Sequence, residues 1–276
     1  MKKARVLFVS QEMVPYLEST YIGEITRNLP QGIQEAGKEI RTFIPRYGCI
    51  NERRNQLHEV IRLSGLNLIV NDEDHPLIIK VASIPAAKMQ VYFIDNYELF
   101  SRKSVLTDKL TGEYHEDNDE RAIFFCRGVL ETVKKLGWAP DVVHCHGWMS
   151  ALVPVYLKKA FSEDPIYANT KVVYSLYDND FGDSLNKSYS KKAIIDGVDA
   201  SDVTLSDDAS FIGLNKMAMD HSDGIIQGSE TVNEELLTYA KESGKPFLDH
   251  IGEEKYIEEY NNFYDSMLSE NSILAE

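Results

Sequence analysis

The fold of this chain is decided by residues 140–154, which read PDVVHCHGWMSALVP. A short apolar run ends in two histidines and a tryptophan, and a new helix is expected to begin at once. In an open parallel sheet, ligands bind in the crevice outside the carboxyl ends of the strands. A His-x-His-x-Trp cluster at that edge would put imidazole donors and an aromatic face at the mouth of a cleft. Such groups suit a neutral polyhydroxy ligand, for example a sugar, better than a phosphate.

The segments before this stretch predict a strand–helix–strand unit. Residues 4–10 form an apolar run typical of a buried parallel strand. Apolar residues then recur at helical spacing from Ile22 to Ala36, and Gly37 is a typical helix stop. A second strand is expected over residues 39–44. Such a unit is the elementary piece of a doubly wound sheet.

The rest of the chain predicts a single α/β domain. Alternating segments within 57–95 (60–63, 66–70, 77–84 and 91–95) indicate an antiparallel β insertion. Further elements are expected as helices over 118–136, 147–159, 211–221 and 253–268, strands over 142–145, 171–176 and 224–227, and a long loop over 178–210. The prediction is one Rossmann-like doubly wound parallel sheet in residues 1–250, with a C-terminal helix in 251–276 packing on it.

Composition excludes several classes of partner. The 276 residues carry a net charge of −15, which argues against binding to nucleic acid or anionic lipid. No apolar run approaches the roughly 20 residues of a membrane span. The first apolar stretch ends at Ser10, too early for a signal peptide. The three cysteines lack a CxxC spacing, so we expect reduced thiols and a cytoplasmic protein.

Four segments resemble the N-terminal half of bacterial glycogen synthases and plant starch synthases, glycosyltransferase family 5. They are the first strand with Gln11-Glu12, the pair Asn28-Leu29-Pro30 and Ile44-Pro45-Arg46-Tyr47-Gly48, the run Asp117-Asn118-Asp119-Glu120-Arg121, and residues 139–157. The resemblance implies one half of a glycosyltransferase B fold, in which two Rossmann-like domains enclose the active site. It also implies that the second domain, which holds most of the nucleotide site, would follow the matched region.

The chain departs from the family pattern at the motifs that carry function. The family's Lys-Thr-Gly-Gly-Leu loop, linked to sugar-nucleotide binding, is replaced by residues 18–22, with Glu18 in place of lysine. His144, His146 and Trp148 match the histidine motif, but Gly147 and Met149 replace its Asp and last His. Tyr177 and Asp178 replace a further His–Asn pair.

By resemblance, the candidate substrate-binding residues are His146, Trp148, Asp117, Arg121 and Lys216, and His146 matches the imidazole placed near the donor glucose. Three of them have a structural alternative. His146 could belong to the scaffold, Trp148 could anchor its helix, and Asp117 could be a helix N-cap; for the last two we favour the structural role. His144 is expected to be a core histidine. We expect the two imidazoles to point to opposite faces of the sheet, with no third ligand nearby, so a metal site is not predicted. No cofactor is predicted either.

Two functions are compatible with these residues. The first is a glycogen/starch synthase-like protein without autonomous transferase activity, with a regulatory, sugar-binding or interaction role. The second is an active enzyme that moves glucose from ADP- or UDP-glucose to an α-1,4-glucan, with a separate chain supplying the second domain. The loop at 18–22 favours the first. Expected partners are an α-glucan or small sugar, and a homodimer or a partner chain that covers the cleft face.

Overall fold

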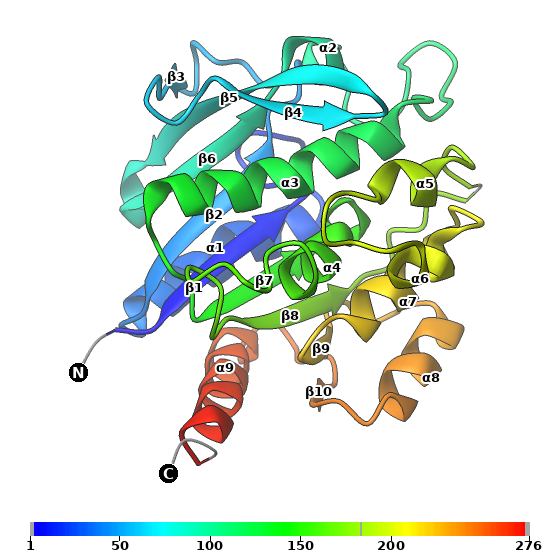
Figure 1. The fold of residues 1–276 in the computed structure, drawn as a ribbon. Helices are drawn as coiled ribbons and strands as arrows, with labels where there is room; N and C mark the ends of the chain where they lie inside the picture. The colour runs from blue at the N-terminus through cyan, green and yellow to red at the C-terminus, as the bar shows by residue number, and fades with distance from the viewer. Residues whose placement is uncertain (1–2, 183, 274–276) are drawn as a thin grey trace.

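The computed structural model describes residues 3–182 and 184–273, which form a three-layer α/β structure (Figure 1). Its strands are β1 (Arg5–Ser10), β2 (Glu39–Pro45), β3 (His58–Glu59), β4 (Leu66–Val70), β5 (Glu73–Ile84), β6 (Met89–Asp95), β7 (Val142–His146), β8 (Lys171–Leu176), β9 (Gly224–Gln227) and β10 (Phe247–Leu248). They are ordered β10-β9-β8-β7-β1-β2-β6-β5-β3, and β4 pairs with β5. The strands from β10 to β6 are parallel. The predicted α/β class with one doubly wound parallel sheet is therefore confirmed.

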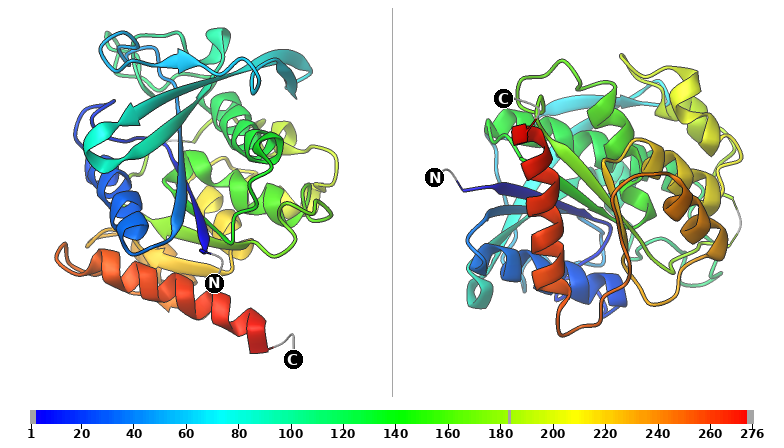
Figure 2. Two further views of the ribbon diagram at one scale, coloured as in Figure 1. Left: turned by 90° about the vertical axis from the view of Figure 1, so that its left-hand side faces the viewer. Right: turned by 90° about the horizontal axis from the view of Figure 1, so that it is seen from below.

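Helices cover both faces of the sheet (Figure 2). They are α1 (Tyr21–Glu35), α2 (Tyr97–Phe100), α3 (Asn118–Leu136), α4 (Leu152–Lys158), α5 (Tyr189–Ala193), α6 (Ala200–Val203), α7 (Phe211–Asp220), α8 (Glu234–Glu242) and α9 (Tyr256–Ile273), with 3-10 turns at Pro85–Ala87, Trp148–Ser150 and Thr204–Ser206. Alternate residues of β1 belong to two different hydrophobic cores. Val6 and Phe8 pack in the cluster that includes α1 and α9, whereas Leu7 and Val9 pack in the cluster that includes α3, α4 and α7.

The helix ends follow the local sequence signals. Thr20 caps α1, because its side chain accepts a hydrogen bond from the amide of Gly23. Gly37 follows α1 with a φ of 102° and Gly137 caps α3 with a φ of 62°, both in the left-handed region that glycine adopts readily. The expected helix at 147–159 begins instead as a 3-10 turn, because the amides of Ser150 and Ala151 bond the carbonyls three residues earlier.

Of the antiparallel strands, β5 and β3 extend the central sheet, whereas β4 pairs with the first half of β5 and contacts α3. β6 pairs antiparallel with β5 on one side and parallel with β2 on the other, where Thr42 lies opposite Val91. The expected strand at 60–63 is a turn in the structure, and the short β3 lies just before it. The segment predicted as a long loop after β8 carries the short helices α5 and α6 and a 3-10 turn.

Helix α9 packs across the sheet face beside α1 (Figure 2). Two glycines allow this close approach. A Cβ at Gly32 would lie 2.5 Å from Ile257, and one at Gly224 would lie 2.8 Å from the sulfur of Met267. Tyr264 is fully buried and its hydroxyl lies 2.6 Å from Nδ1 of His144. Within the described residues, no helix is long and apolar enough to cross a bilayer.

Candidate functional site at the carboxyl ends of the strands

The carboxyl ends of β1, β7, β8 and β9 lie at one edge of the sheet. The register places Ser10 opposite His146 and His146 opposite Ser175, so the residues that follow them converge. A cleft of about 670 Å³, here called the strand-end cleft, lies at this edge. It is lined by Glu12, Thr20, Tyr21, Ile22, Tyr177, Asp178, Asn179, Ser229, Glu230, Thr231, His250, Gly252 and Glu253. This is the place where a doubly wound sheet binds its ligands.

The two histidines of β7 lie on the same face of the sheet, and the expectation of opposite faces was wrong. Side chains two residues apart on a strand point to the same side. The ring centroids of His144 and His146 are 3.9 Å apart, and both side chains are fully buried. The described residues contain no group of three or more side chains suited to hold a metal ion.

Both imidazoles are engaged in buried hydrogen bonds. Those of His144 join Tyr264 at 2.6 Å and Ser175 at 2.7 Å, and Nδ1 of His146 lies 2.7 Å from the hydroxyl of Tyr177. Burial lowers the pKa of His146 to about 3 and the pKa of His144 well below its ordinary value. Both rings are therefore neutral at physiological pH, which argues against a role for either as a general acid.

Tyr177 separates His146 from the cleft. The tyrosine follows β8 directly, is almost fully buried, and lines the cleft, whereas His146 does not. Gly228 leaves the space for this ring, because a Cβ there would lie 2.7 Å from the tyrosine ring carbons. A ligand in the cleft would thus meet Tyr177 before it could reach His146.

The other four candidates from the sequence lie outside the strand-end cleft. Trp148 is 1% exposed and its ring packs edge-on against Phe181, with 5.0 Å between the centroids. Asp117 occupies the N-cap position of α3, but its carboxylate accepts from Arg102 and makes no cap bond. Lys216 pairs with Glu235 at 2.6 Å.

Arg121 is a buried packing residue. Its guanidinium lies over the rings of Tyr47 and Phe100, at 5.3 and 5.1 Å from their centroids. It donates hydrogen bonds to the carbonyl of Val105 and to the side chain of Asn118. Burial lowers the pKa of Arg121 to about 10, so the group still carries its charge at neutral pH. These contacts hold the loop before α3 against the helix.

The strand-end cleft is acidic. Its lining includes the carboxylates of Glu12, Asp178, Glu230 and Glu253, and among the residues that the structure describes it includes neither lysine nor arginine. Burial raises the pKa of Glu12, while hydrogen bonds from Thr20 and Gln11 oppose that shift. Glu18 is exposed and does not line the cleft, so the substituted loop contributes Thr20, Tyr21 and Ile22. Among the described residues, the one side chain of the lining that can become cationic is that of His250.

Comparison with known proteins agrees with this architecture. A model of the starch synthase catalytic domain family matches residues 5–250. The chain belongs to this family. It is 37% identical over 173 residues to the glycogen synthases of Chlorobium limicola and Chlorobaculum tepidum, covering 63% of this chain and 35% and 36% of theirs. The chain therefore spans about a third of the length of these relatives.

The fold is also that of a known starch synthase. The catalytic domain of starch synthase IV from Arabidopsis thaliana, bound to ADP and acarbose, superimposes with a TM-score of 0.69. The superposition covers 91% of this chain and 52% of that protein, at 16% sequence identity. This likeness establishes the shared fold of one half of a starch synthase.

The departures from the family motif are built into the local backbone. Gly147, which replaces the motif's Asp, has φ 83° and ψ 158°, a conformation almost confined to glycine. A Cβ at this position would lie 2.2 Å from Oε1 of Gln11, which in turn accepts from Asn179. Met149, which replaces the last His, is buried and accepts from the hydroxyl of Tyr47 at 3.0 Å. Neither position presents a polar side chain to a ligand.

Restoring the family residue at position 147 is expected to destabilise the protein. Gly147→Asp would strain the backbone and displace Gln11, at a cost of about 1–3 kcal/mol in unfolding free energy. Urea denaturation would measure the loss. Gly112→Asp is the control, because Gly112 has a φ of 76° but a Cβ there would meet no neighbouring atom within 4 Å. Equal stability of the Gly147 variant and the parent would contradict the steric account.

The residues that line the cleft were largely missed from the sequence. Tyr177, Asp178 and Ser229 follow β8 and β9, so the rule that ligands bind beyond strand ends could have selected them. The resemblance favoured instead the matched motif residues, of which His146, Trp148 and Arg121 are buried here. His250 and Glu253 lie in the segment between β10 and α9, where no sequence pattern indicates that they line a cleft together with Glu12.

Proposed function

We propose that this chain is a glycogen/starch synthase-like protein that does not transfer glucose by itself and that acts as a sugar-binding or interaction subunit. The acidity of the strand-end cleft is the observation that carries the proposal. Four carboxylates line it, and no lysine or arginine of residues 3–182 and 184–273 does so. The free thiols are consistent with a cytoplasmic location, which we include in the proposal.

Charge argues against a sugar nucleotide as the ligand. At an effective dielectric constant near 20, two unit charges about 4 Å apart repel by about 4 kcal/mol. A diphosphate in the cleft would meet four carboxylates and, among the described residues, neither lysine nor arginine. A neutral sugar avoids this cost, because carboxylates, the hydroxyls of Ser229 and Thr231 and the amide of Asn179 can all hydrogen-bond to its hydroxyl groups.

The second candidate is an active transferase completed by another chain. The extent of the structural match supports it, because this chain matches 52% of a starch synthase catalytic domain that is bound to ADP and acarbose. On this account a partner would supply the remaining half and the cations for the nucleotide. The two candidates differ in whether the strand-end cleft contributes to nucleotide binding.

Transfer of labelled glucose tests the proposal. The purified chain should show no detectable transfer to glycogen from ADP-glucose or UDP-glucose, because the cleft repels a diphosphate. In parallel, calorimetry should detect maltose weakly and ADP not at all. Glu12→Gln in the cleft and the exposed Glu163→Gln serve as matched variants. Sustained transfer that is lost in the first variant and kept in the second would overturn the proposal.

A further inference from the structure

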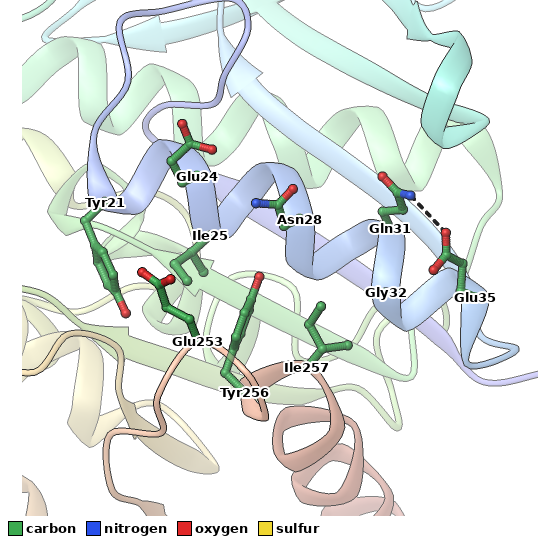
Figure 3. Close-up of a pocket in the computed structure, with 10 residues that line it drawn as sticks. All are labelled: Tyr21, Glu24, Ile25, Asn28, Gln31, Gly32, Glu35, Glu253, Tyr256 and Ile257. Atoms are coloured by element: carbon green, nitrogen blue, oxygen red, sulfur yellow. Dashed lines mark hydrogen bonds between the residues drawn. The ribbon is translucent and has the colours of Figure 1, made fainter.

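A second hollow continues the strand-end cleft along α1. It has a volume of about 600 Å³ and lies between α1 and the start of α9. Figure 3 shows Glu253, Tyr256 and Ile257 opposite α1, whose residues from Tyr21 to Glu35 line the other side. The two hollows share Tyr21 and Glu253. Together they form one surface, here called the acidic trough.

The trough carries charge of one sign. Its carboxylates are Glu12, Asp178, Glu230 and Glu253 from the cleft, joined by Glu24 and Glu35 from α1. In the part of the chain that the structure describes, no lysine or arginine lines either hollow. Among the described residues, none of the ion pairs involves any of these six carboxylates. Their charges are therefore not compensated by a cation of the described chain, although Glu12, Glu24, Glu35 and Asp178 accept side-chain hydrogen bonds.

The trough also offers apolar and amide groups. Ile25, Tyr256 and Ile257 contribute apolar surface along α1, while Asn28 and Gln31 contribute side-chain amides. From Tyr21 to Glu35 the helix rises about 21 Å at ~1.5 Å per residue. An extended peptide of about six or seven residues would span that length.

We propose that the acidic trough is a docking surface for an extended, lysine- or arginine-rich segment of a partner protein. Its cations would pair with the carboxylates and its apolar side chains would contact Ile25, Tyr256 and Ile257. Charge complementarity selects this occupant, and a second copy is disfavoured because each chain has a net charge of −15. The inference specifies the interaction role in the proposed function. It does not depend on whether glucose is transferred.

Fluorescence anisotropy with a labelled peptide of lysine pairs separated by single leucines tests the docking surface. The parent protein should bind this peptide and should not bind the same peptide with glutamate in place of lysine. Binding should weaken as salt increases, since exposed charges are screened. Failure of the lysine peptide to bind even at low salt would overturn the proposal.

Two charge-matched variants distinguish binding at the acidic trough from general attraction to a negatively charged protein. The first combines Glu24→Lys, Glu35→Lys and Glu253→Lys in the trough, and the second combines Glu73→Lys, Glu113→Lys and Glu163→Lys; all six residues are exposed. The trough variant should bind the lysine peptide about tenfold more weakly than the parent, and the second should stay within about twofold. Equal loss in both would show attraction to net charge alone and would overturn the proposal. Circular dichroism would confirm that both variants are folded. Glucosyl transfer is measured in a separate assay, so its outcome does not decide the docking test.

Discussion

Tyr264→Ala is expected to lower the free energy of unfolding by about 4 kcal/mol. The fully buried side chain packs in the core formed by α1, α9 and the adjacent strands. Truncating a buried aromatic side chain to alanine typically costs about 3–5 kcal/mol. The change also removes the hydroxyl that lies 2.6 Å from Nδ1 of His144, so a buried imidazole nitrogen loses its partner. Urea denaturation would measure the loss.

Two variants separate the contributions to this effect. Tyr264→Phe keeps the ring but removes the hydroxyl, and should cost about 1–2 kcal/mol. Tyr97→Ala removes a tyrosine that is 77% exposed and should change stability by less than about 0.5 kcal/mol. A loss below about 1 kcal/mol for Tyr264→Ala would mean that the packing of α9 on the sheet contributes little to the stability of the fold.

The sheet was predictable from the sequence because its signals are local. The apolar run at 4–10, the helical spacing from Ile22 and the glycine at 37 each indicate one element and its limits. The pairing of β6 with β2 was not predictable, because it joins strands separated by the whole β3–β5 segment. Such a register depends on long-range packing, which periodicity does not report.

The position of the candidate site in the fold was predictable from the sequence, but the residues that line it were not. Strand ends identify the edge of the sheet, and the structure places a cleft there. Which side chains reach the cleft depends on rotamers and on single substitutions. Tyr177 covers His146 because Gly228 leaves room for its ring. At position 147 glycine fits because Gln11 occupies the space that a side chain would need. Matching a residue to a family motif cannot show that a neighbour has buried it.

Acidification is expected to destabilise the protein through its buried histidines. Burial lowers the pKa of His146 to about 3 in the folded state, whereas an unfolded histidine has a pKa near 6.5. Between these values the unfolded chain binds a proton that the folded chain does not bind. Stability is therefore fully present above about pH 6.5 and falls as the pH drops toward 3. From pH 7.5 to pH 5, His146 should account for a loss of about 2 kcal/mol, and His144 adds a loss of the same sign.

Unfolding free energies at a series of pH values, for the parent and for His146→Gln, would measure this contribution. The variant lacks the imidazole, so its stability should decline by about 2 kcal/mol less than that of the parent between pH 7.5 and pH 5. Tyr167→Phe is the matched control: it removes a buried hydroxyl that donates to the carbonyl of Leu130 and should lower stability without changing the pH slope. Identical slopes for the parent and His146→Gln would mean that the imidazole is protonated equally in both states. The His146 imidazole would then be accessible to water, and a direct role for His146 in ligand binding would have to be considered again.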